Sequence, residues 1–182
     1  MRQRITSSRL QQLMEALGSS AKSAARVFLV GGATSVLLGW RESTIDVDLK
    51  IVPESDEILR RLPELKERLQ MNIELASPDD FIPELPGWQE RSRFVQQESK
   101  LSFFHYDFYA QALAKIERSH SIDMQDVREM IKRGLVEPGR LLELFLSIED
   151  QLYRYPAIDR SSFRQAVERV VGEAEADSRK GK

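Results

Sequence analysis

The stretch that decides the fold is residues 27–52, which read VFLVGGATSVLLGWRESTIDVDLKIV. It opens with an all-apolar run, residues 27–30, that is too short for a helix and stops at two glycines, Gly31 and Gly32. Short apolar runs that end at glycine are typical of buried strands, so a strand is predicted there. Residues 33–38 are then predicted to form a short helix that stops at a further glycine.

The second half of this stretch predicts a strand with two carboxylates on one face. Residues 45–52 alternate strictly between apolar and polar side chains. Because alternate residues of a strand point to the same side, Asp46 and Asp48 project together from the polar face. Residues 71–76 alternate again and form a predicted third strand, on which Glu74 occupies a polar position. Whether this strand lies beside that of Asp46 is left open by the sequence.

The rest of the chain places this region in an α/β (α+β) fold. A first helix is expected to end at Gly18, and helices are predicted at 9–17, 54–69, 108–118, 123–133, 138–152 and 161–174, with a hairpin formed by 93–98 and 101–106. Strands interleaved with helices and followed by a run of helices predict a small mixed β-sheet flanked by helices, with a C-terminal helical portion. We expect a core over residues 1–134, a helical extension over 135–176 and a disordered tail over 177–182.

Composition narrows the class of protein. The chain has 182 residues, a formal net charge of −2, 41% hydrophobic residues and no cysteine. The near-neutral charge excludes binding driven by a uniformly basic surface, and the lack of cysteine excludes disulfides, thiolate metal sites and cysteine nucleophiles. No apolar run is long enough to span a bilayer, and Met1 to Thr6 has no apolar segment typical of a signal peptide. We therefore expect a cytoplasmic protein with no membrane partner.

The paired acids point to a divalent cation. Two carboxylates that project side by side repel each other unless a cation lies between them. All-oxygen ligands favour Mg²⁺ or Mn²⁺, and a third carboxylate from Glu74 would allow a two-metal site. The alternative is that Asp46 and Asp48 lie on a solvated face and that Gly31 and Gly32 form only a tight turn.

In order and spacing these motifs resemble the signature of the nucleotidyltransferase superfamily, the polymerase-β-like fold. Gly31-Gly32 is followed after thirteen residues by Asp46-Val47-Asp48, and later by Ile73-Glu74-Leu75. The sequence of residues 30–49 is similar to that of the minimal prokaryotic nucleotidyltransferases, including the AbiEii- and MenT-type toxins of toxin–antitoxin systems. A second motif of these proteins is similar to residues 112–118, which contain a lysine and an arginine, with two aspartates, at 123 and 126, following.

The resemblance implies an activity and a set of site residues. Asp46, Asp48 and Glu74 would be catalytic and would bind Mg²⁺ or Mn²⁺. The nucleotide would be bound by Gly31, Gly32, Thr34 and Lys115. The chain would transfer a nucleoside monophosphate from an NTP to an acceptor hydroxyl on RNA, tRNA, a protein or a small molecule, and an antitoxin protein is a possible partner of such an enzyme.

Other interpretations of the same residues stay open. Lys115 could pair with neighbouring acids, and Arg118, Asp123 and Asp126 could form an ion network between two helices. A group of aromatic residues is expected to be packing, with base stacking as the alternative: Phe103, Phe104, Tyr106, Phe108 and Tyr109. Thr44 is expected to stabilise its loop or contact phosphate, and His105 to be structural. A non-catalytic nucleotidyltransferase-like module that binds nucleotide or protein is the alternative function.

Overall fold

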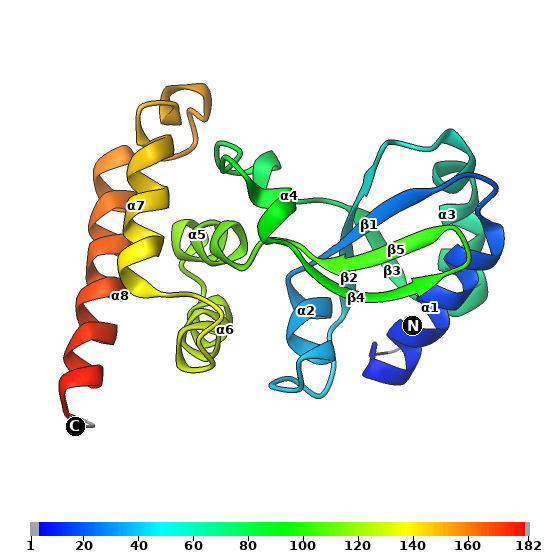
Figure 1. Ribbon diagram of the computed structural model, residues 1–182, viewed down its shortest axis with the longest axis horizontal. Helices are drawn as coiled ribbons and strands as arrows, with labels where there is room; N and C mark the ends of the chain where they lie inside the picture. Colours follow the sequence, from blue (N-terminus) through cyan, green and yellow to red (C-terminus); the bar gives the residue numbers. More distant parts are fainter. Residues whose placement is uncertain (1–3, 181–182) are drawn as a thin grey trace. The chain divides into compact units, whose positions relative to one another are not determined.

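Five strands form one mixed sheet in the order β3-β2-β1-β5-β4 (Figure 1). The strands of the computed structural model, which describes residues 4–180, are β1 (Ala25–Val30), β2 (Asp46–Val52), β3 (Asn72–Leu75), β4 (Arg93–Glu98) and β5 (Leu101–His105). β1 is antiparallel to β2 and parallel to β5, while β2 is parallel to β3 and β4 is antiparallel to β5. The predicted α/β class and mixed sheet are confirmed.

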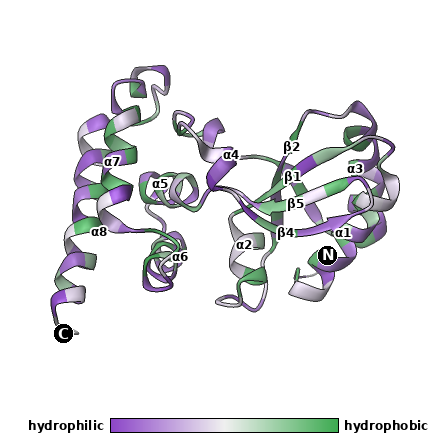
Figure 2. Ribbon diagram, in the orientation of Figure 1, coloured by the Kyte–Doolittle hydropathy of each residue, from purple (hydrophilic) through white to green (hydrophobic). Residues whose placement is uncertain are grey.

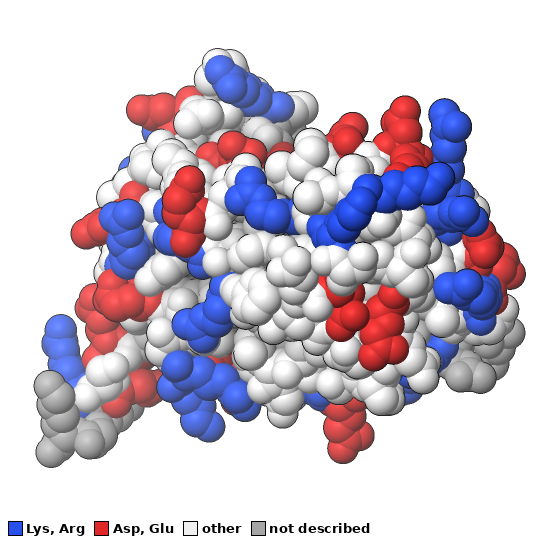
Figure 3. Space-filling view, turned by 45° about the vertical axis from the view of Figure 1, so that its right-hand side comes forward, with Lys and Arg blue, Asp and Glu red and all other residues white. Residues whose placement is uncertain are grey.

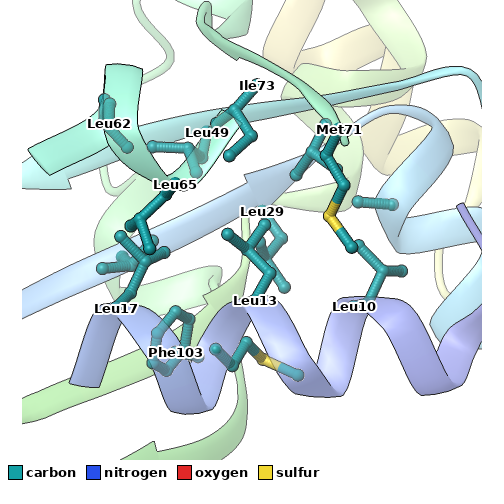
Figure 4. Close-up of a cluster of buried hydrophobic side chains, with 14 of the residues drawn as sticks. Leu10, Leu13, Leu17, Leu29, Leu49, Leu62, Leu65, Met71, Ile73 and Phe103 are labelled. Atoms are coloured by element: carbon teal, nitrogen blue, oxygen red, sulfur yellow. The ribbon is translucent and has the colours of Figure 1, made fainter. Parts of the chain in front are cut away.

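One face of this sheet packs into the hydrophobic core of the first compact unit. This unit comprises residues 4–77 and 92–106 of the described chain. The helices α1 (Ser7–Ser20) and α3 (Asp56–Leu69) lie on the same side of the sheet (Figure 1). Figure 4 shows α1 directing its apolar side chains toward those of the strands and of α3; among the labelled residues are Leu10, Leu13, Leu17, Leu29, Leu49, Leu65, Met71 and Phe103. Each such burial stabilises the fold by about 1.5–3 kcal/mol. The alternation of β2 therefore turns its polar residues to the opposite face.

The predicted short helix is α2 (Gly32–Leu37), which follows β1 directly. Its N-cap is Gly31, with φ 62° and ψ −125°, a backbone conformation that L side chains rarely adopt. Gly39 has φ 82° and follows the end of the helix, as the sequence predicts. The glycine turn is thus a sharp reversal of the chain at the end of β1.

The predicted role of Gly18 as a helix terminator is wrong. α1 continues to Ser20, and Gly18 is a buried residue within it. A Cβ on Gly18 would lie 2.5 Å from Cβ and 2.6 Å from the backbone oxygen of Glu98. This glycine is required because α1 passes against β4 at that point, a long-range contact that local sequence does not encode.

The second compact unit is helical and comprises residues 78–91 and 107–180 of the described chain. Its elements are η1 (Pro78–Asp80), α4 (Trp88–Arg91), α5 (Phe108–Arg118), α6 (Ser121–Lys132), α7 (Pro138–Glu149), η2 (Leu152–Arg154) and α8 (Arg160–Lys180). Along α7 and α8, hydrophobic residues stand beside hydrophilic ones (Figure 2). The two helices pack together, with the rings of Phe145 and Phe163 4.9 Å apart and the buried Glu149 accepting hydrogen bonds from Arg164.

The two units divide the chain differently from the predicted boundary at residue 134. α5 and α6 belong with α7 and α8, and the segment 78–91 joins the same unit. Residues 81–92, whose prolines and glycine predict an irregular loop, contain the helix α4. The predicted disordered tail from residue 177 is helical through Lys180, and residues 181–182 lie outside the described part. Between residues 4 and 180, no helix is both long and apolar enough to cross a membrane.

Candidate functional site

Asp46 and Asp48 lie half-buried on the polar face of β2, as the alternation predicts. Asp48 is the register partner of Val30, the last residue of β1. A Cβ on Gly31 would lie 3.3 Å from Oδ2 of Asp48. The glycine turn and the second carboxylate are therefore immediate neighbours, although 16 residues of sequence, positions 32–47, separate them.

Glu74 lies on the strand beside the paired acids. β3 is parallel to β2, with Asp48 opposite Glu74 and Asp46 opposite Asn72. Residues paired in this way point to the same face of a sheet, so the three carboxylates share one face. Glu74 is exposed, and the Asn72 amide Nδ2 donates a hydrogen bond to its Oε1 at 2.6 Å. The register thus answers the question that the sequence left open.

Thr44 connects Gly32 with the acids. Its backbone forms a bridge with Ile5, with N–O distances of 2.7 and 2.9 Å, and its hydroxyl donates to Oδ1 of Asp46 at 3.5 Å. A Cβ on Gly32 would lie 2.1 Å from Oγ1 of Thr44. Gly32 is therefore needed because the Thr44 side chain fills the adjacent space, a role that spacing alone did not reveal.

Thr34 is fully buried in α2, two residues after Gly32. Its hydroxyl donates to the Leu29 carbonyl at 3.2 Å, so it accepts from the other partner, Nδ1 of His105, at 3.3 Å. Burial, with a smaller contribution from the charge of Arg93, lowers the pKa of His105 to about 4. A neutral imidazole and a threonine thus tie the turn to the ends of β1 and β5. The structure gives the Thr34 hydroxyl partners inside the unit, where the resemblance implied contact with nucleotide.

Lys115 lies in the second unit, where it is 5% exposed. Its Nζ donates to Oδ1 of Asp123 at 3.1 Å and to Oδ2 of Asp126 at 2.7 Å, and Arg118 donates to both oxygens of Asp123. Burial alone would raise the pKa of Asp123, but the hydrogen bonds and charges of Arg118 and Lys115 outweigh it and hold that pKa below its usual value. These contacts favour the interpretation of the second motif as an ion network between α5 and α6.

The chemistry of the donor set suits a hard cation. In the chain from residue 4 to residue 180, no three His, Asp or Glu side chains gather closely enough to hold a metal by themselves. Mg²⁺ in proteins is commonly bound by one or two carboxylates together with substrate phosphates and water, and Asp46 with Asp48 meets that requirement. Figure 3 shows acidic and basic side chains interspersed over the visible face, in keeping with the near-neutral charge.

Comparison with known proteins assigns the family. Searches of curated proteins and of solved structures found no match to this chain. A family model described as "Nucleotidyltransferase of unknown function" (DUF6036) matches residues 8–170, which include the glycine turn, all three carboxylates and the ion network. The strand order and the acid-bearing strands described above agree with that match, and the chain belongs to this nucleotidyltransferase family.

Proposed function

We propose that this protein is a metal-dependent enzyme that transfers a nucleoside monophosphate from an NTP to an acceptor hydroxyl. The observation that carries the proposal is the shared sheet face, on which Asp46 and Asp48 stand beside the Gly31 turn and Glu74 stands in register with Asp48. Family membership supports the general class of reaction.

Asp46 and Asp48 would hold Mg²⁺ or Mn²⁺, and Glu74 is a candidate third ligand. When bound, the cation would neutralise phosphate charge and polarise the α-phosphate. The exposed Glu74 is suited to accept the proton of the attacking hydroxyl. The acceptor oxygen would form a bond to the α-phosphorus while the bond to pyrophosphate breaks, and the chain would contribute mainly positioning and charge neutralisation.

The glycine turn would contact the phosphates. Gly31 has a positive φ and no Cβ, so no side chain covers its backbone beside Asp48. Thr44 packs against Gly32, and the hydrogen bond between Thr34 and His105 links the helix after the turn to β5. The proposal places Gly31 and Gly32 nearest the nucleotide, with Thr34 buried in α2.

Acceptor and biological role are the finer part of the proposal. The resemblance to toxin nucleotidyltransferases favours RNA, and tRNA in particular, as acceptor, with an antitoxin as protein partner. The alternative is a non-catalytic module that binds nucleotide or protein. The observation that favours this alternative is that the described residues contain no cluster of three acidic or histidine ligands.

A label-transfer assay tests the proposal. The protein is incubated with each α-labelled NTP and with total RNA or protein, in the presence of Mg²⁺, Mn²⁺ or a chelator. We expect labelled product from one or more NTPs, lost with chelator and reduced on the order of 10²-fold or more by Asp46→Asn or Asp48→Asn. Asp177→Asn, on the exposed face of α8, is the matched control and should leave transfer unchanged. Label transfer that survives in both site variants would refute the mechanism, and nucleotide binding with no transfer to any fraction would favour the non-catalytic module.

A toxin role predicts a second result. Expression of the wild-type chain in bacterial cells should slow growth, and Asp46→Asn should remove that effect at equal protein level. Equal growth inhibition by both proteins would argue against toxicity through nucleotidyl transfer.

A further inference from the structure

A row of phenylalanines lies on the same sheet face as the candidate acids. Phe28, Phe104 and Phe94 are register partners across β1, β5 and β4. Phe28 is also the partner of Lys50, which follows Asp48 two positions along β2. Because positions two apart on a strand share a face, the phenylalanine row lies next to the row that contains Asp48.

The rings of this row are held by one another. The centroids of Phe28 and Phe104 are 5.4 Å apart with an interplanar angle of 27°, and those of Phe104 and Phe94 are 5.6 Å apart at 77°. Phe28 also contacts Tyr106 edge to face at 6.1 Å. Contacts of this kind restrict ring motion, so the row offers preorganised aromatic surface.

Exposure rises along the row toward the edge strand. Phe28 is fully buried, Phe104 is half-buried and Phe94 is 56% exposed. Phe103, Tyr106 and Phe108 are buried, so packing within the protein explains these aromatic residues. Phe104 and Phe94, at the outer end of the row, are the ones with surface available to a ligand. An exposed ring beside an aromatic neighbour has the form of a stacking surface for a planar ligand.

The spacing of the sheet relates this surface to the acids. Phe104 lies two strands and one row away from Asp48, which corresponds to about 12 Å between their Cα atoms. Phe94 lies one strand farther from Asp48, at about 16 Å by the same spacing. A nucleoside triphosphate in an extended conformation is of comparable length, so one nucleotide can reach from the acids to the outer rings. Lys50 places a positive charge between the acids and the rings, which matches the negative charge of phosphates.

We propose that Phe94 and Phe104 form a stacking site for the base of the NTP whose phosphates are bound at Asp46 and Asp48. The inference rests on the proposed function and adds a subsite to it. Since every base has an aromatic face, stacking here gives affinity with little discrimination among the four bases. Discrimination would have to come from groups at the edge of the base.

Equilibrium binding with and without a base tests this site. We would measure the affinity of wild-type protein and of Phe94→Ala and Phe94→Trp for Mg²⁺–ATP, Mg²⁺–CTP and Mg²⁺–tripolyphosphate, which lacks sugar and base. Phe94→Ala should weaken NTP binding about 5-fold to 150-fold and leave tripolyphosphate binding unchanged, and Phe94→Trp should retain or strengthen NTP binding. Phe81→Ala is the matched control, because Phe81 is 54% exposed and lies in the helical unit.

The outcomes separate this inference from the proposed function. Equal NTP affinity of wild type and Phe94→Ala would overturn the stacking site while leaving the phosphate site standing. A loss confined to binding of single-stranded RNA, with NTP affinity unchanged, would also overturn it, since the rings would then serve an acceptor. Failure of the wild-type protein to bind both tripolyphosphate and every NTP would refute the proposed function itself. An unchanged melting temperature of Phe94→Ala verifies that the variant is folded.

Discussion

At the scale of single residues, the two glycines of the turn meet different demands. Gly31 needs its backbone conformation, since its φ of 62° is costly for any residue with a Cβ. Gly32 has no positive φ but lacks room, because Oγ1 of Thr44 occupies the place of a side chain. The turn is thus fixed by torsion at one position and by packing at the next.

The packing demand at Gly32 gives a stability prediction. Gly32→Ala should lower the free energy of unfolding by about 1–3 kcal/mol, because the new methyl group must displace Thr44 from a buried position. Urea denaturation measures this effect. Gly172→Ala is the control: a Cβ there meets nothing within 4 Å, and the substitution in α8 should stabilise by about 0.5–1 kcal/mol. A neutral effect of Gly32→Ala would mean that Thr44 moves away freely.

At the scale of elements, α5 and α6 are joined by charges that are almost entirely buried. Lys115, Asp123 and Asp126 are each at most 5% exposed, and the Lys115 ammonium lies between the two carboxylates. Every buried polar side-chain atom among the described residues has a hydrogen-bond partner. Removal of the lysine would leave two buried acids with less compensation.

The ion network predicts a structural effect for Lys115. Lys115→Met should destabilise the protein by about 3–5 kcal/mol, because breaking a buried pair leaves uncompensated charge. Thermal or urea unfolding checks this result. The control is Lys132→Met, which makes the same substitution at an exposed lysine of α6. A variant of normal stability with a greatly reduced kcat/KM would instead return Lys115 to the phosphate-binding role implied by the resemblance.

The sequence predicts where helices and strands lie better than it predicts which of them contact one another. The strict alternation of β2 and the apolar run of β1 place both strands to within two residues, and helix α5 begins and ends where its pattern indicates. Pro63 lies inside α3 and does not divide it. α4 was missed because its four residues contain no full period, and its buried Trp88 gives no local signal.

Candidate site residues were found where chemistry follows from local spacing. Asp46 and Asp48 share a face because they are two positions apart on a strand, and this spacing is visible in the sequence. The position of Glu74 beside Asp48 depends on strand pairing, and the partners of Thr34 and Lys115 depend on packing between elements far apart in the chain. The periodicity of the sequence does not predict such long-range contacts. The surroundings of Glu74, Thr34 and Lys115 are therefore known only from the folded structure.

At the scale of the whole molecule, buried ionisable groups make stability depend on pH. His105 is 4% exposed, and its pKa is lowered to about 4 from an ordinary value of 6.5. Above pH 6.5 the imidazole is neutral in both states and adds no pH dependence. As the pH falls below 6.5, the unfolded chain takes up a proton that the folded chain refuses, so stability decreases until the folded state also protonates near pH 4.

This linkage predicts a loss of about 3 kcal/mol from His105 between pH 6.5 and pH 4. Asp123 has a lowered pKa because Arg118 and Lys115 outweigh its burial, and the hydrogen bonds of Arg164 and Arg160 lower the pKa of Glu149. These carboxylates add a loss of stability as the pH falls through and below their ordinary values of 3.8 and 4.5. Urea unfolding at several pH values measures the slope. His105→Gln should flatten it between pH 6.5 and 4.5, and His120→Gln, at an exposed histidine, is the matched control. A variant at position 105 with an unchanged slope would contradict the prediction.

The strand order also bears on how the chain assembles during synthesis. β1 lies at the centre of the sheet, yet its parallel partner β5 begins only at Leu101, after β2, β3 and the first segment of the helical unit have been made. At typical translation speeds, roughly 4 to 15 s separate the synthesis of Phe28 from that of Phe104. During that interval β1 is an open edge of apolar residues, a surface that chaperones bind and that aggregates form on. The nascent chain is therefore most exposed to aggregation while the acid-bearing strands β2 and β3 already exist and β5, the second neighbour of β1, is still missing.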